Sequence, residues 1–202
     1  MTLPLILCLV ATVIPVFFSR LSATPVWLSI QALTLVWITA LGEEIWSLHA
    51  MMSVAEILVI RVALVPYLLS RAIRKTPQAR MSVMPSNLFA WGAAIPLIIL
   101  AFKFGDGAQA DHRALTLGVV AATATIAFLI LATNHNPAAQ LVAVLFMENA
   151  LALFESLMPE SWPIPVHLAV SAVYVLTAMV GSWLVRGHCI TLPSRETKGE
   201  LQ

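Results

Sequence analysis

One uninterrupted stretch, LHAMMSVAEILVIRVALVPYLLS (Leu48–Ser70), decides the class of fold to expect. Its only charged residues are Glu56 and Arg61, and the remainder is almost entirely apolar. A helix needs about 20 mainly apolar residues to cross the roughly 30 Å hydrocarbon core of a bilayer. Inside that core every backbone polar group must be bonded within its own segment, so the stretch predicts a transmembrane helix.

The rest of the chain has the same apolar character. Of 202 residues, 60% are hydrophobic and 10% charged, with a mean hydropathy of +0.91, whereas soluble domains hold about 25% charged residues. The net charge of +1 offers no basic surface for nucleic acid. Cys8 and Cys189 lie far apart without C-x-x-C spacing, so we expect no disulfide, no metal site and no cofactor in this chain.

Seven runs of this kind predict an all-α, polytopic membrane bundle. The loops between them are short and carry the prolines, glycines and charges typical of loops, so no extramembrane domain fits between the spans. We expect a single transmembrane domain over residues 1–188, followed by a polar tail at 189–202. The predicted spans are 3–18, 25–41, 48–70, 86–102, 114–133, 137–158 and 163–186.

The distribution of basic residues predicts the orientation of the bundle. Cytoplasmic loops of membrane proteins carry an excess of lysine and arginine. With seven spans, one side of the membrane receives most of the basic residues. The opposite side receives only Lys103 and Arg113, together with the acidic Glu43, Glu44 and Glu160. We therefore expect the N-terminus outside and the C-terminus in the cytoplasm of a bacterial or archaeal cell membrane. The residues predicted on the cytoplasmic side are Arg20, Arg71, Arg74, Lys75, Arg80, Arg186, Arg195 and Lys198.

Two carboxylates in the sixth span are candidates for ion translocation. Glu148 lies about halfway along the span, next to Asn149, and Glu155 follows seven residues later on the same face. A charge at mid-membrane costs about 2.5 to 3.5 kcal/mol on insertion scales, so such residues usually face the bundle interior and mark a function. Two carboxylates about 10 Å apart along one stripe can pass protons through intervening water. The alternative is a neutral, hydrogen-bonded Glu148 and an interfacial Glu155.

The third span adds a buried cation. Arg61 stays charged in any protein environment and needs a carboxylate or carbonyls. Pro66 disrupts the bond to the carbonyl of Val62, which predicts a kink and a free carbonyl beside Arg61; Pro96 predicts a kink in the fourth span. Glu56 lies five residues before Arg61, about 140° around an α-helix, so we expect each to meet another helix rather than its neighbour. A purely structural ion pair between helices is the alternative.

The seventh span carries a polar stripe at helical spacing. His167, Ser171 and Tyr174 stand at i, i+4 and i+7 on an otherwise apolar helix. Histidine titrates near neutrality, so His167 is a candidate for proton exchange close to the outer surface, although an interfacial hydrogen-bonding role is also open. Gln31 marks the second span in the same way. IQALTL (Ile30–Leu35) faintly echoes MENALAL (Met147–Leu153), which suggests two related three-helix halves around a fourth-span linker, or chance.

Two windows resemble the hydrogenase-4 component E family (HyfE). They are RVALVPYLLSRAIRKTP (Arg61–Pro77) and LFMENALALFESLMPESWPIPVHLAVSAVYVLTAMVGSWLVR (Leu145–Arg186). That family supplies a small membrane subunit to formate hydrogenlyase-like and other group 4 [NiFe] hydrogenase complexes. Its C-terminal half is similar to NuoK of complex I and MrpC of Mrp antiporters.

The resemblance implies roles for particular residues. The family's Met-Glu-Asn signature falls on Met147, Glu148 and Asn149, so Glu148 would stand for the membrane glutamate of the NuoK-like proton pathway. The family's lysine before the L-V-P element becomes Arg61, which cannot release a proton and so suggests a fixed electrostatic role. Ser171 stands where the family tends to have an acid, so the usual carboxylate relay is incomplete.

The function expected is that of a noncatalytic membrane subunit in a complex I-like or group 4 hydrogenase-like assembly, contributing to proton or sodium translocation. The partners implied are antiporter-like membrane subunits, a NuoH-like membrane anchor and a peripheral hydrogenase or dehydrogenase arm. Basic residues at the cytoplasmic side would face that arm or bind anionic lipid headgroups. The alternative is a structural spacer that joins antiporter-like and anchor subunits without conducting ions.

Overall fold

The computed structural model describes residues 2–18, 21–42, 48–75, 88–105, 111–158 and 162–188. Within these residues the chain forms seven helical rods and no strand. Three successive elements, α3, η2 and α4, run on without a break and form one rod, called here the α3–α4 rod. The elements are α1 (Thr2–Phe18), η1 (Leu21–Ala23), α2 (Thr24–Gly42), α3 (Leu48–Glu56), η2 (Ile57–Leu64), α4 (Val65–Arg74), α6 (Leu88–Gly105), α7 (His112–Thr133), α8 (Pro137–Glu155) and α9 (Ile164–His188).

The rods match the seven predicted runs, and their described ends agree within four residues. Local chemistry sets two of the starts: the Asp111 side chain accepts a bond from the His112 amide at α7, and Asn136 accepts one from the Ala138 amide at α8, where Pro137 follows. Five of the rods are long and apolar enough to cross a membrane, and α1 and α6 contain shorter apolar helices.

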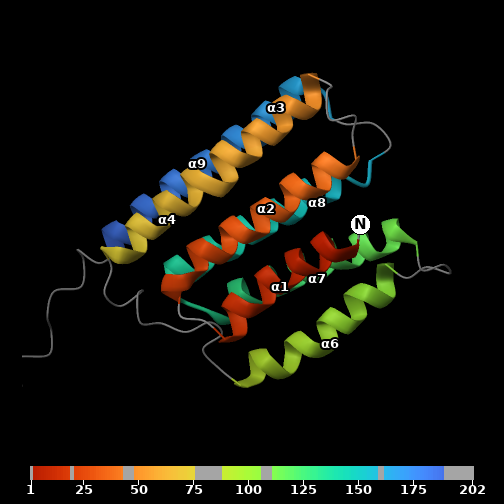
Figure 1. The fold of residues 1–202 in the computed structure, drawn as a ribbon. Helices are drawn as coiled ribbons and strands as arrows, with labels where there is room; N and C mark the ends of the chain where they lie inside the picture. The colour runs from red at the N-terminus through yellow and green to blue at the C-terminus, as the bar shows by residue number, and fades with distance from the viewer. Residues whose placement is uncertain are drawn as a thin grey trace, which may run out of the picture.

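The rods pack in two layers of three, with α6 at one edge (Figure 1). One layer holds α1, α2 and the α3–α4 rod, and the other holds α7, α8 and α9. Across the layers α1 packs on α7, α2 on α8 and α4 on α9, while α6 packs on α7. This arrangement agrees with the two three-helix halves that the internal echo suggests. It also places the α2 and α8 segments of that echo at the centre of the bundle.

Close approach of the helices depends on small residues. Buried alanines line α8 at positions 138, 139, 143 and 150, and Gly181 of α9 leaves room for Leu141, since a Cβ there would overlap the Leu141 side chain. Small residues let helix backbones approach closely, which is how helices associate where no hydrophobic effect drives them together. Short interhelical distances in turn allow short polar side chains such as asparagine to reach a neighbouring helix.

Large apolar side chains cover the outside of the bundle, and polar ones lie inside it. Ile95, Val173 and Trp183 are among many large hydrophobic residues left exposed, whereas Arg61, Gln31 and Asn149 are buried. A soluble monomer rarely exposes apolar surface of this extent. The distribution, together with the five long apolar helices, is that of a multi-pass membrane protein.

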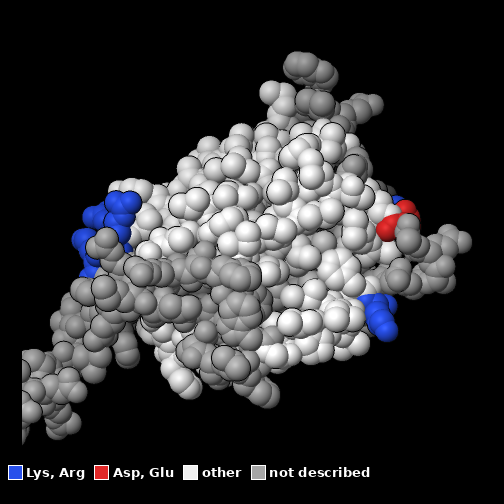
Figure 2. Space-filling model, turned by 60° about the horizontal axis from the view of Figure 1, so that its bottom comes forward, with Lys and Arg blue, Asp and Glu red and all other residues white. Residues whose placement is uncertain are grey.

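On the face of the molecule shown in Figure 2, the exposed charged residues gather at the two ends of the rods. Arg71, Arg74 and Lys75 at the end of α4 lie at the same end as Arg186 of α9, and we call these four residues the basic end. Lys103, Asp111 and Arg113 lie at the opposite end. The other residues used to predict orientation lie outside the described residues, as does the tail at 189–202. They are Arg20, Glu43, Glu44, Arg80, Glu160, Arg195 and Lys198.

Candidate functional site

Arg61 lies at the centre of a buried polar cluster. Its side chain is 2% exposed and comes from η2, the π-helical middle of the α3–α4 rod. Nη1 donates a hydrogen bond to Oδ1 of Asn149 at 3.0 Å and lies 3.5 Å from the backbone carbonyl oxygen of Glu148, both on α8. The guanidinium carbon stands 4.5 Å above the centre of the Tyr174 ring of α9, a cation–π contact. Arg61 therefore links its own rod to α8 and α9.

Glu56 pairs directly with Arg61, so the expectation that the two would not meet is wrong. Glu56 Oε1 lies 3.5 Å from Arg61 Nε, and the two side chains are 8% and 2% exposed. The expectation assumed an α-helix, in which five residues turn by about 140° beyond a full circle. The segment Ile57–Leu64 is instead a π-helix, whose hydrogen bonds join residues five apart. Residues i and i+5 then share one face, and the pair closes within a single rod.

The Val62 carbonyl, which was predicted to lie free beside Arg61, is bonded by another residue, and a kink at Pro66 stays a prediction. Pro66 stands in the first turn of α4, directly after the π-helix, and the Val62 carbonyl four residues earlier accepts a hydrogen bond from Ser29 Oγ at 2.9 Å. This bond from Ser29 links α2 to the turn of the α3–α4 rod that precedes Pro66. Arg61 binds oxygens of α8 instead. Pro96 lies inside α6, and a kink there stays a prediction.

Glu56 also contacts the polar stripe of α9. Ser171 Oγ donates a hydrogen bond to Glu56 Oε1 at 2.7 Å, and His167 Nε2 lies 3.4 Å from Glu56 Oε2. Tyr174, the third member of the stripe, lies under Arg61. All three residues of the predicted stripe therefore face the Glu56–Arg61 pair. The resemblance leads one to expect an acid at position 171. This chain has a serine there, and its hydroxyl donates to the acid Glu56 of another helix.

His167 joins this cluster to Glu155. The second ring nitrogen, Nδ1, lies 3.4 Å from Glu155 Oε2 at the C-terminal end of α8, and the two side chains are 17% and 16% exposed. The predicted partners for Glu155 were Glu148 and intervening water. In the structure the Glu155 carboxylate meets a histidine of the neighbouring helix, and through it Glu56.

The Asn149 side chain that binds Arg61 begins a series of hydrogen bonds between uncharged groups. Asn149 Nδ2 donates to Gln31 Oε1 at 3.0 Å, and Gln31 Nε2 donates to Thr12 Oγ1 at 2.8 Å. Thr12 in turn donates to the Cys8 carbonyl within α1 at 3.1 Å. These side chains are all buried and link α8, α2 and α1. Gln31 and Asn149, each followed by Ala-Leu, are the polar residues of the internal echo, in a register one residue from that in which Gln31 matches Glu148.

Glu148 contacts Arg61 through its backbone, and a role of its carboxylate in ion translocation stays a prediction. Its backbone carbonyl oxygen lies 3.5 Å from Arg61 Nη1, and its side chain is half-buried. The neighbouring Asn149 supplies the side chain that binds the cation. Within the described side chains, Glu56 and Glu155 are the carboxylates that lie within 3.5 Å of a basic side chain of the cluster.

Sequence reasoning missed Thr12 and Ser29. A hydroxyl in an apolar span commonly bonds to the carbonyl one turn earlier on its own helix, as both residues also do here with Cys8 and Pro25. Only the neighbouring helix reveals their second role. The side chain of His49 lies outside the described part of the structure. In the described residues, no group of histidine, cysteine, aspartate or glutamate is arranged to hold a metal ion.

Comparison with known proteins adds no relative to this picture. No family model, no curated protein and no solved structure matches the chain. The buried cluster and the resemblance of two segments to the HyfE family are therefore the indications of function.

Proposed function

We propose that this chain is a noncatalytic membrane subunit of a complex I-like or group 4 hydrogenase-like redox complex, and that it contributes to proton translocation through its buried ionisable residues. The observation that carries the proposal is the chain of contacts from Glu155 through His167 and Glu56 to Arg61. Ionisable side chains at membrane depth are costly, and they commonly mark ion or proton pathways. Association with a redox complex comes from the resemblance to the HyfE family.

A proton suits the cluster better than a sodium ion. The carboxylate of Glu56 accepts a hydrogen bond from the Ser171 hydroxyl and lies within 3.5 Å of the His167 ring and the Arg61 guanidinium. A bound sodium ion would have to displace these groups from the carboxylate. A proton can instead move between the carboxylate and the His167 ring without displacing them. The imidazole of His167 lies between two carboxylates and can accept a proton at one ring nitrogen and release one from the other.

The proposal places the rods across a bacterial or archaeal cell membrane, with the basic end toward the cytoplasm and the N-terminus outside. Arg71, Arg74, Lys75 and Arg186 at one end support this orientation through the bias of basic residues. The partners proposed are antiporter-like membrane subunits, a NuoH-like anchor and a peripheral hydrogenase or dehydrogenase arm. The basic end would face that arm or anionic lipid headgroups.

A structural spacer is the second candidate. The uncharged chain Asn149–Gln31–Thr12 favours it, because buried amides in direct contact fasten helices together but do not exchange protons near neutral pH. Arg61 also keeps its charge permanently. A spacer role predicts that the cluster stabilises the complex and that its acids can be neutralised without loss of ion movement.

Translocation by the whole complex separates the two candidates. The complex is purified in mild detergent through a tag on this chain, its partner chains are identified, and proton movement is followed in vesicles. We expect Glu56→Gln to lower proton movement about a hundredfold at normal subunit content, the size of effect typical of losing a proton-transfer group. Glu148→Gln tests the role implied by the resemblance. Unchanged translocation in both variants would refute the conducting role, and isolation of the chain only as a homo-oligomer would refute the proposed partners.

A further inference from the structure

His167 lies between two carboxylates, and each ring nitrogen faces one of them. Nδ1 is 3.4 Å from Glu155 Oε2, and Nε2 is 3.4 Å from Glu56 Oε2. The three residues come from three elements, α8, α9 and α3, so their meeting depends on the packed bundle. A neutral imidazole carries one N–H, so it can donate to only one of the two carboxylates. At the other carboxylate the lone pair of the second ring nitrogen faces a carboxylate oxygen, and the two repel each other.

One additional proton removes this conflict and also balances the charge. With two carboxylates, a neutral histidine and the permanent cation of Arg61, the four groups sum to one negative charge. An extra proton, held as imidazolium or as a carboxylic acid, makes the sum zero. Uncompensated charge inside a membrane is costly. The cluster is therefore built to hold one exchangeable proton.

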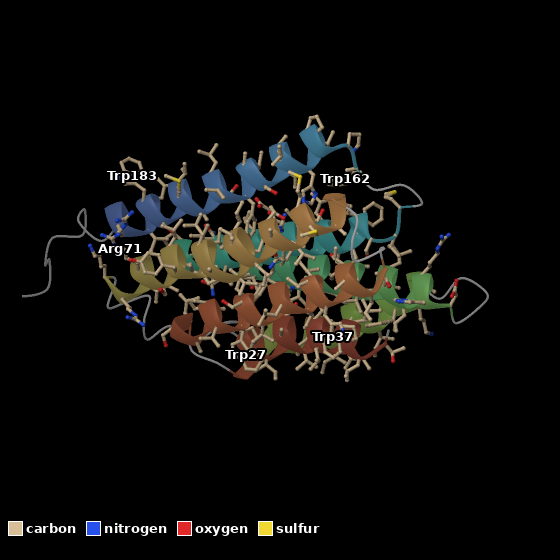
Figure 3. The ribbon with its side chains drawn as sticks, turned by 45° about the horizontal axis from the view of Figure 1, so that its top comes forward. Trp27, Trp37, Arg71, Trp162 and Trp183 are labelled. Carbon is tan, nitrogen blue, oxygen red and sulfur yellow. The ribbon has the colours of Figure 1, made fainter. Side chains whose placement is uncertain are left out.

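Exposure decreases along the cluster from one end to the other. Glu155 and His167 are 16% and 17% exposed, Glu56 is 8% exposed, and Arg61 is 2% exposed. The exposed side lies where α8 ends and α9 begins, near Trp162, at the opposite end of the rods from Arg71 and Trp183 (Figure 3). A proton would thus enter at the α8–α9 end and travel inward.

We propose that Glu155, His167 and Glu56 form a one-proton relay that opens at the α8–α9 end and stops at Arg61, with His167 as the transferring residue. This inference rests on the proposed function and names the side of access and the residues that carry the proton. Other titratable or charged groups around the relay in the described structure are Arg61 on η2 and Tyr174 on α9, with Glu148 on α8 beyond Arg61.

The transfer step needs no oxidant, reductant or second reactant. A proton on Glu155 Oε2 passes to His167 Nδ1, so an O–H bond breaks as an N–H bond forms. The proton on Nε2 passes to Glu56 Oε2, and the ring is left as the opposite tautomer. Return of the proton along the same path, or exchange of the tautomer, resets the ring.

Arg61 ends the relay for two reasons. Its guanidinium does not release a proton, and its next contacts are the Asn149 amide and the Glu148 backbone carbonyl. Protonation of Glu56 would also remove the charge that faces Arg61 Nε at 3.5 Å. Arrival of the proton at Glu56 would therefore change the electrostatic force on Arg61. Through the contacts of Arg61 this change would reach η2 and α8.

The test uses His167→Gln in the full chain, with His135→Gln as the matched control. His135 is exposed in the turn before α8, so the same substitution there removes a histidine without touching the relay. Infrared difference spectra of the full chain in lipid nanodiscs, recorded between high and low pH, report protonation of carboxylates. We expect a glutamic acid signal in wild type and His135→Gln that is lost or moved to a different pH range in His167→Gln.

Translocation by the complex gives the second readout. We expect His167→Gln to slow proton movement about a hundredfold and His135→Gln to leave it unchanged. If His167→Gln does not accumulate, Glu155→Gln at the exposed side provides the same test with the same expected losses.

A carboxyl signal that is unchanged in folded His167→Gln overturns the relay. Normal translocation in His167→Gln with loss in Glu148→Gln overturns the relay but keeps the proposed function. A His167-dependent signal in a complex that moves no protons keeps the proton site and overturns the proposed function.

Discussion

Glu56 and Arg61 are five residues apart in one rod, and their charged groups meet at 3.5 Å because the helix between them is wound as a π-helix. The pair is almost completely buried, and both partners continue into contacts with other helices. Local helix geometry therefore decides whether the cation and the acid are a pair or two isolated charges.

Replacing Arg61 should leave the buried carboxylate of Glu56 without its cationic partner and so lower the stability of the protein. We expect Arg61→Met to lower the free energy of unfolding by about 3 to 5 kcal/mol, the usual effect of breaking a buried ion pair. Unfolding in mixed micelles measures the loss. Arg71→Met, at an exposed position of the basic end, should change stability by less than about 0.5 kcal/mol. Equal losses in the two variants would contradict a buried pair.

A double-mutant cycle measures the coupling between the two charges. We expect Glu56→Gln and Arg61→Met together to cost less than the sum of the single variants, with a coupling of about 0.5 to 3 kcal/mol. Additive effects would mean that the 3.5 Å approach contributes nothing to stability.

Pro66 should control that coupling. Pro66→Ala restores an N–H donor directly after the π-helical segment and lets it rewind as an α-helix, which would turn Arg61 about 140° away from Glu56. We therefore expect the Glu56–Arg61 coupling energy to fall in the Pro66→Ala background. Pro96→Ala, the matched change inside α6, should leave it unaltered. A coupling that persists in Pro66→Ala would show that the π-helix forms without the proline.

The uncharged chain makes a separate prediction about stability. Gln31→Leu leaves the Asn149 amide and the Thr12 hydroxyl without their mutual partner, and a buried polar group left unbonded costs about 1 to 3 kcal/mol. Gln140→Leu is the control, because Gln140 is half-buried and bonds to the Asn134 carbonyl near the end of the bundle. We expect a smaller loss there, and a similar loss at both sites would argue against a tightly bonded core.

Cysteine labelling tests the proposed orientation. In a background with Cys8→Ala and Cys189→Ser, we expect a thiol at Arg113→Cys to react with an impermeant maleimide added outside intact cells. A thiol at Arg74→Cys should react only after the membrane is opened. Both positions are exposed and lie at opposite ends of the rods, so reversed labelling would invert the orientation.

The ends of the helices could be predicted closely from the sequence. The third rod was expected at 48–70 and runs over Leu48–Arg74, because an apolar run bonds its own backbone wherever it lies. The stripe His167, Ser171 and Tyr174 was predictable for a similar reason: the 3.6-residue period places them on one face of any α-helix. The face that the stripe meets was not predictable, since it depends on how α9 packs on the α3–α4 rod.

The sequence by itself determined the all-helical fold, the positions of the rods and the presence of charges inside them, because these depend on interactions within each helix. Only the tertiary structure decided the pairing of Glu56 with Arg61, the links to Thr12 and Ser29, and the choice of Asn149 rather than the Glu148 carboxylate as the ligand of the cation. These contacts depend on local rewinding of one helix and on distances between helices, and neither is encoded in the period of a single span.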